Sequence, residues 1–231
     1  MPNCDSPYLE WHHFNPPWSV RNHHEPAGMI ALCSTHHRKA DAGAFTADQL
    51  REFKSANRSK FVQGRFDWLR RKLLAVVGGN FYYETYQVLD FHGLDAVSFN
   101  RDGNGHVMLS AKLHRPQGPS LEIESNDWIS HGGLEDLECP PSGKLLHAKY
   151  PNGDRLKVEF LEVHSAERLE QSFDFVPRWM WQNALEFPLT AVSIEYEVPA
   201  RGVILSATNS TFGGVSIRGS FFQHVFTAIS I

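Results

Sequence analysis

The chain has 231 residues, of which 42% are hydrophobic and 21% are charged, as in ordinary globular proteins. No apolar run approaches the roughly 20 residues that span a bilayer, and the first residues lack the basic start and apolar stretch of a secretory signal. Three cysteines are an odd and small number, which argues against a disulfide framework. The composition therefore excludes a membrane-spanning or disulfide-stapled protein, and we expect a cytoplasmic one with no membrane partner.

The net charge of −4 is unevenly distributed along the chain. Residues 1–72 contain 11 lysines and arginines against 7 aspartates and glutamates, whereas residues 73–231 contain 11 against 19. This asymmetry predicts two modules with different partners. The basic module can approach a phosphate backbone, and the acidic one cannot do so unaided.

The N-terminal part is rich in histidine, with six of the 13 histidines in residues 1–37. Residues 9–14 are typical of a strand that ends in paired histidines. Residues 29–41 are typical of a short strand running into a helix, for which Ser34 can serve as the cap and Gly43 as the stop. We therefore expect two strands and a helix in this part of the chain.

Two further helices are predicted next. The segment Thr46-Ala-Asp-Gln49 is a capping-box pattern, so we expect a helix that continues to about Ala56. A second helical pattern follows, ended by a pair of glycines and with one apolar face formed by Phe66, Leu69, Leu73 and Val77. The predicted organisation is a small module over residues 1–56, a helical linker over residues 57–79 and a further domain over residues 80–231.

From residue 80 onward, alternating and short apolar runs predict strands. These runs lie at residues 107–113, 121–123, 145–150, 156–163, 191–198 and 203–207. Asn152-Gly153 between two of them is a strong hairpin signal, because glycine suits a tight turn. The predicted fold class is α+β: a small N-terminal ββα module, a helical linker, and a mostly antiparallel, β-rich domain that forms a sandwich or a barrel-like structure.

Three side chains of the N-terminal module are candidates for binding a metal ion. His37 and Asp41 are four residues apart, so both project from one face of the predicted helix. Together with a histidine from the preceding strand, they make a three-ligand set that leaves coordination positions open to water and substrate. Open coordination is typical of a catalytic metal, whereas a structural metal site is closed.

These residues resemble the HNH family of ββα-metal nucleases, in which a His-His pair precedes a Leu-Cys-x-x-Cys-His-like segment and a last ligand four residues on. The resemblance covers residues 4–54. It implies that His12, His37 and Asp41 bind one catalytic divalent cation and that His13 is the general base. A carboxylate at position 41 is an acceptable ligand, and the ion is Mg²⁺, Mn²⁺, Ni²⁺ or Zn²⁺.

The chain departs from the family pattern at the central asparagine. Gly28 occupies the position before the second strand where the family has this residue, whose role is to orient the base histidine. Asn22, His23 or His24 can supply that contact from the preceding loop, and the sequence does not distinguish among them.

A second departure concerns the structural zinc that many members of the family hold. Cys33 and His36 form one ligand pair, and a neutral imidazole can replace a thiolate. On the other side the sequence offers only Cys4, whose family partner would precede Met1. Either the zinc site is incomplete or the natural chain starts earlier.

The resemblance implies an endonuclease that hydrolyses phosphodiester bonds, and DNA is the expected partner. By analogy with other proteins that contain such a module, we expect a role in bacterial or phage-related defence. Arg21, Arg38 and Lys39 are the cations expected to contact the backbone. One alternative is a catalytically inactive, metal-stabilised module that binds nucleic acid or protein, which Gly28 favours. Another alternative is an RNase. The β-rich domain is expected to serve regulation, sensing of a ligand or homo-oligomerisation.

Overall fold

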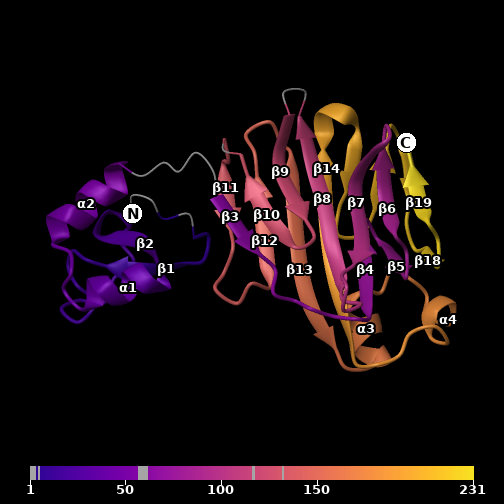
Figure 1. Ribbon diagram of the computed structural model, residues 1–231, viewed down its shortest axis with the longest axis horizontal. Helices are drawn as coiled ribbons and strands as arrows, with labels where there is room; N and C mark the ends of the chain where they lie inside the picture. The colour runs from indigo at the N-terminus through magenta and orange to yellow at the C-terminus, as the bar shows by residue number, and fades with distance from the viewer. Residues whose placement is uncertain (1–3, 5, 57–61, 116–117, 132) are drawn as a thin grey trace.

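The computed structural model describes every residue of the chain except 1–3, 5, 57–61, 116–117 and 132 (Figure 1). The fold is mixed α+β with mostly antiparallel sheets, as the sequence predicts. The N-terminal elements are β1 (Leu9–His13), β2 (Met29–Cys33), α1 (Ser34–Asp41) and α2 (Ala47–Ala56). Figure 1 shows these four elements grouped at one end of the molecule, beside the sheets formed by the rest of the chain.

The N-terminal elements enclose a small core of their own. Strands β1 and β2 pair antiparallel, with His12 opposite Ile30. Helix α1 begins directly after β2, and α2 lies on the same side. The buried members of this core are Phe14, Ile30, Leu32, Ala40 and Leu50. Side chains at paired positions share a face of a hairpin, so His12 lies on the face that the helices cover.

The ends of the two helices are set by local hydrogen bonds. Helix α1 is capped by Cys33, without a side-chain bond, so the prediction of Ser34 as its cap is wrong by one residue. Gly43 ends α1 as predicted, because its φ of 78° allows the turn in which Gly43 N–H bonds the carbonyl of Ala40. At α2, the backbone N–H of Gln49 donates to Thr46 Oγ1 (3.2 Å) and that of Thr46 to Gln49 Oε1 (2.9 Å), which confirms the capping box.

The β-rich part, residues 62–231, contains two sheets. One has seven strands in the order β19-β6-β7-β8-β9-β10-β3, and the other has ten, with β11 to β17 in sequence order and β4, β5 and β18 attached through β14. The strands are β3 (Val62–Arg65), β4 (Leu73–Val77), β5 (Asn80–Tyr83), β6 (Gln87–Phe91), β7 (Leu94–Arg101), β8 (Val107–Arg115), β9 (Gly118–Glu124), β10 (Asp127–Ser130), β11 (Asp136–Glu138), β12 (Leu145–Lys149), β13 (Arg155–Val163), β14 (Leu189–Val198), β15 (Val203–Leu205), β16 (Ser210–Phe212), β17 (Val215–Ile217), β18 (Phe221–Gln223) and β19 (Thr227–Ser230).

Apolar side chains from both sheets meet in one large core. It includes Val97 and Leu109 from the seven-stranded sheet and Leu146 and Val158 from the ten-stranded sheet. The opposite face of the ten-stranded sheet packs under the short helices α3 (Ala166–Ser172) and α4 (Arg178–Trp181), where Trp181 is fully buried. Burial of such large apolar side chains is the main force that holds the two layers together.

The predicted helical linker over residues 57–79 is wrong where the structure describes it, which is from residue 62 onward. Residues 62–65 and 73–77 are the strands β3 and β4, and each pairs within one of the two sheets. All five residues of β4 are buried because the large core covers one face of the strand and the helices α3 and α4 cover the other. A short apolar run buried on both faces carries no alternation, so its sequence cannot be told from a helix.

The strands and turns predicted beyond residue 80 are confirmed. Each of the six predicted runs overlaps a strand. The hairpin between β12 and β13 turns through Pro151–Asp154, where Gly153 N–H bonds the carbonyl of Tyr150 (3.0 Å) and Gly153 has a φ of 87°. Across the described residues, none of the helices combines the length and the apolar character needed to cross a membrane.

Alkaline pH is expected to destabilise the β-rich part. Burial raises the pKa of Tyr196 from 10.0 to about 12 and the pKa of Cys139 from 9.0 to about 12. Because folding favours the neutral forms, the stability that these groups contribute is complete below pH 9 and is lost as the pH rises through 12. We expect the free energy of unfolding to fall over this window, by about 3 kcal/mol for Tyr196 and by a further amount for Cys139, as measured by urea denaturation at stepped pH. Cys139→Ala should make the fall smaller, and an unchanged fall would contradict the assignment.

Candidate metal centre

Three side chains from β1 and α1 converge on one point. His12 Nδ1 lies 3.2 Å from Asp41 Oδ1, and His37 Nδ1 lies 3.0 Å from Asp41 Oδ2. One ligand atom from each of the three residues lies within 4.8 Å of the other two. We call this set the metal-ligand cluster. The structure therefore brings together the three residues that the sequence proposed as ligands of one cation.

The secondary structure explains why these side chains meet. His37 and Asp41 are one turn apart on α1 and project from the same side of the helix. His12 comes from the helix-facing side of β1, and its ring meets that of His37 edge to face, with centroids 5.1 Å apart. The arrangement depends only on the hairpin register and on the direct passage from β2 into α1.

The environment of the cluster suits metal binding. His37 Nε2 lies 3.4 Å from the carbonyl oxygen of Trp11, which leaves Nδ1 free to face Asp41. A histidine that ligates a metal commonly donates its other nitrogen to such a carbonyl. Burial lowers the pKa of His12 below its usual range, although the Asp41 carboxylate opposes the shift. The lowered pKa favours the neutral imidazole, which is the form that binds a metal ion.

His13 follows His12 along β1 and lies in a different environment. Successive side chains of a strand point to opposite faces, so His13 faces the loop that connects β1 to β2. Its ring packs against Trp18 (centroids 4.7 Å apart), His23 (5.0 Å) and His24 (6.0 Å). His13 Nε2 is buried and has no hydrogen-bond partner among the described residues. The ring is therefore held by packing, and its Nε2 makes no hydrogen bond to the described part of the chain.

A single cavity of about 820 Å³ contains both the metal-ligand cluster and His13. Its wall also includes the two tryptophans Trp11 and Trp18, and its apolar side comes from α1, α2 and the loop between them. The side chain of Asp41 is 56% exposed, so solvent reaches the cluster from this side. The opening leaves room for water and substrate beside the three candidate ligands.

The residues proposed to orient His13 have different surroundings. His23 is buried: its Nδ1 accepts from the backbone N–H of Glu25 (3.1 Å), so its Nε2 carries the hydrogen and donates to the carbonyl of Pro16 (2.8 Å). Both of its nitrogens are therefore engaged, and His23 supports His13 only through ring packing. Asn22 is exposed. His24, unlike His23, is exposed.

The backbone explains why residue 28 is a glycine. A Cβ atom at Gly28 would lie 2.0 Å from the carbonyl oxygen of Asn15 and 3.0 Å from His23 Cε1. This close approach exists because the carbonyl of Gly28 accepts hydrogen bonds from the N–H groups of Phe14 (2.9 Å) and Asn15 (3.2 Å). The loop packs so closely against the end of β1 that no side chain fits at position 28. This excludes the asparagine of the family pattern.

A second cluster contains the residues proposed for structural zinc. Cys4 Sγ lies 3.7 Å from Cys33 Sγ, which lies 3.1 Å from His36 Nδ1. Burial raises the pKa of Cys4 and lowers the pKa of His36. Within the described part of the chain, this group has three members, one fewer than a closed zinc site requires. Cys139 lies in the core of the β-rich part.

The cations of the N-terminal elements lie on α1, α2 and the loop after β1; among them, Arg51 lies 6.0 Å from the ring centroid of Phe14 in the cavity wall and pairs with Asp48. Arg38 and Lys39 are exposed on α1, and Arg21 forms an ion pair with Glu25 (2.6 Å). Residues 1–56 contain five lysines and arginines against six aspartates and glutamates, so the basic excess of residues 1–72 lies in residues 57–72. Described cations of that segment pair with carboxylates of the β-rich part: Arg65 with Asp127, Arg70 with Glu162, and Lys72 with Glu186. Arg70 and Lys72 thus pair within the β-rich part, where the sequence predicted a helical linker.

The sequence did not single out Trp11 and Trp18 as parts of the site. Trp18 lies in a loop after two prolines, where no periodic pattern indicates the position of its ring. Comparisons of this chain with protein-family models, with curated proteins and with solved structures find no match. The chemistry of the site must therefore be argued from its own residues.

Proposed function

We propose that residues 4–56 form a ββα-metal module of the HNH type and that this module hydrolyses phosphodiester bonds in DNA. The observation that carries the proposal is the convergence of His12, His37 and Asp41 in one cavity with a histidine that has a free, buried nitrogen. Two imidazoles and one carboxylate are a ligand set suited to Mg²⁺, Mn²⁺, Ni²⁺ or Zn²⁺.

Each residue of the cavity has a role that its surroundings support. His12, His37 and Asp41 would hold the cation, which when bound supplies positive charge to a phosphate oxygen and to the departing oxygen. His13 would take a proton from the attacking water, which requires its buried Nε2 to become accessible to water when substrate binds. Packing by Trp18 and His23 fixes the ring of His13 without occupying this nitrogen.

The direct test is metal-dependent cleavage by the purified full chain. Supercoiled plasmid, single-stranded circular DNA and RNA are incubated in parallel with Mg²⁺ or Mn²⁺, and with a chelator. We expect cleavage of DNA with either ion and none with the chelator. Calorimetric titration with Mn²⁺ should show binding that Asp41→Ala weakens. Absence of both cleavage and metal binding would refute the proposal.

A second candidate function is a metal-stabilised module without catalysis, which Gly28 favours because the family's orienting asparagine is absent. In this case metal ions still bind the cluster and raise the melting temperature, because a ligand that binds only the folded state stabilises it. The same experiment separates the two functions. Metal binding and stabilisation without cleavage of any of the three substrates would favour the second.

A further inference from the structure

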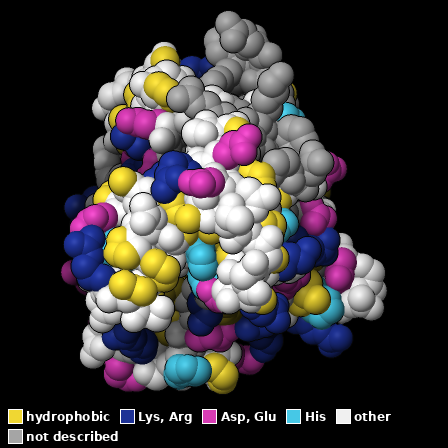
Figure 2. Space-filling model, turned by 90° about the vertical axis from the view of Figure 1, so that its left-hand side faces the viewer, with side chains coloured by type: hydrophobic (Ala, Val, Ile, Leu, Met, Phe, Trp, Pro, Cys, Tyr) yellow, Lys and Arg dark blue, Asp and Glu magenta, His cyan; other side chains and the backbone are white. Residues whose placement is uncertain are grey.

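Two large aromatic side chains at the cavity are exposed to solvent. The exposed fractions are 64% for Trp11 and 44% for Trp18, and both residues line the cavity that holds the metal-ligand cluster. Neither ring belongs to the small core of the N-terminal elements. On this end of the molecule, Figure 2 shows hydrophobic side chains next to histidines and to basic side chains. Exposed apolar groups gathered at a cavity mark a binding surface more often than scattered ones do.

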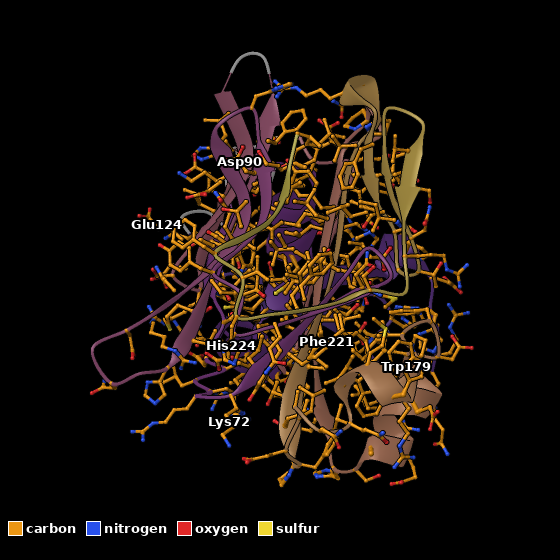
Figure 3. The ribbon with its side chains drawn as sticks, turned by 90° about the vertical axis from the view of Figure 1, so that its right-hand side faces the viewer. Lys72, Asp90, Glu124, Trp179, Phe221 and His224 are labelled. Carbon is orange, nitrogen blue, oxygen red and sulfur yellow. The ribbon has the colours of Figure 1, made fainter. Side chains whose placement is uncertain are left out.

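Exposure alone does not make a tryptophan part of a site. Trp179 is 71% exposed as well, but it lies on α4, on the side of the molecule away from the N-terminal elements (Figures 1 and 3). No described histidine–carboxylate cluster accompanies it. Trp11 and Trp18 differ from Trp179 because each borders the groups proposed for catalysis. Trp179 is for this reason a matched control.

The charge of the N-terminal elements restricts how they can bind a nucleic acid. Residues 1–56 carry one more acidic than basic residue. Phosphate contacts by lysine and arginine supply most of the affinity of nonspecific DNA-binding proteins. Here the exposed cations include Arg38 and Lys39 on α1 and Arg51 on α2, and Arg51 is paired with Asp48, so we expect contacts with the bases to supply a larger share. In a duplex, the base faces are already stacked and cannot reach a tryptophan ring.

We propose that the cavity binds single-stranded nucleic acid, with unpaired bases stacked on Trp11 and Trp18, on the side of β1 that carries His13. This inference rests on the proposed function and names its substrate class. Base–aromatic stacking is tolerant of sequence, because every base has a π face. The module should therefore prefer unpaired regions without strong sequence specificity.

The test compares base-containing and abasic DNA bound to the full chain in the presence of a chelator, so that no cleavage occurs. The probes are a fluorescein-labelled 12-nucleotide single strand of mixed sequence, the same strand as a duplex, and a strand of equal length made of abasic units. Fluorescence anisotropy should show binding to the single strand at least about tenfold tighter than to the other two, since stacking contributes about 1–3 kcal/mol per base. The dependence on salt should be shallow, because few phosphates are contacted.

Variants assign the effect to Trp11. Trp11→Ala should weaken binding of the single strand about tenfold and reduce the preference over the abasic strand by the same factor, because Trp18 still stacks on one base. Trp11→Phe should retain most of the affinity, and Trp179→Ala should have no effect. If Trp11→Ala fails to fold, as judged by circular dichroism, the unmodified chain still tests the stacking proposal through its binding of base-containing and abasic strands.

The outcomes separate this inference from the proposed function. Equal binding of base-containing and abasic strands overturns the stacking proposal, even where metal-dependent cleavage is observed. Base-dependent binding that Trp11→Ala weakens, in a protein that cleaves no substrate, supports the stacking surface and refutes the nuclease. Preference for the duplex overturns the substrate class named here.

Discussion

Replacing His13 with alanine is expected to lower the rate of metal-dependent DNA cleavage by about 10²- to 10⁴-fold, the usual contribution of a general base. Metal binding should be unchanged, because His13 points away from the face of β1 that carries His12. The measurement is the initial rate of cleavage of a labelled substrate at saturating Mn²⁺. A calorimetric titration with the same ion shows whether the cluster is intact.

His164→Ala is the matched control for this prediction. His164 is exposed, follows β13 in the β-rich part and belongs to neither cluster of candidate ligands, so its removal should change the rate by no more than a few-fold. If His13→Ala cleaves as fast as the unmodified chain, His13 is not the base. If it loses metal binding instead, the separation of roles along β1 is wrong.

The parts of the site that the sequence predicts are those set by local geometry. Four-residue spacing on a helix places His37 and Asp41 on one face whatever the rest of the fold. The two predicted strands must then pair in the register that places His12 beside His37 and Asp41. The capping box at Thr46 and the turn at Gly153 are predictable for the same reason, since each depends on residues within one turn of the chain.

Features set by distant contacts are not predictable in this way. Strand β4 pairs in parallel with β14, more than a hundred residues later, and only that pairing and the layers on both faces make it a strand. Arg70 pairs with Glu162, 92 residues later, so the segment is basic in the sequence while the charge of Arg70 is balanced in the fold. The burial of His23 likewise depends on two backbone groups that no side-chain pattern reveals.

The structure also predicts that restoring the family asparagine at position 28 is harmful. Gly28→Asn is expected to lower the free energy of unfolding of the N-terminal elements by about 1–3 kcal/mol, the usual cost of overpacking. The new Cβ would lie 2.0 Å from the backbone oxygen of Asn15, and a backbone atom cannot rotate away as a flexible side chain can. The loop must therefore separate from the end of β1, which weakens the bonds from Phe14 and Asn15 to the carbonyl of residue 28.

Cleavage should fall together with stability in this variant, because the displaced segment directly follows His13 and also carries Trp18. Thermal unfolding by circular dichroism and the initial cleavage rate are measured on the same preparation. Gly103→Asn is the control: a Cβ at Gly103 meets no atom within 4 Å, and asparagine is a favourable residue in turns, so stability should stay within about 0.5 kcal/mol. An active Gly28→Asn variant of undiminished stability would show that the loop can accept the family residue. Gly28 would then represent the loss of the family's orienting side chain, and this backbone would not require a glycine at position 28.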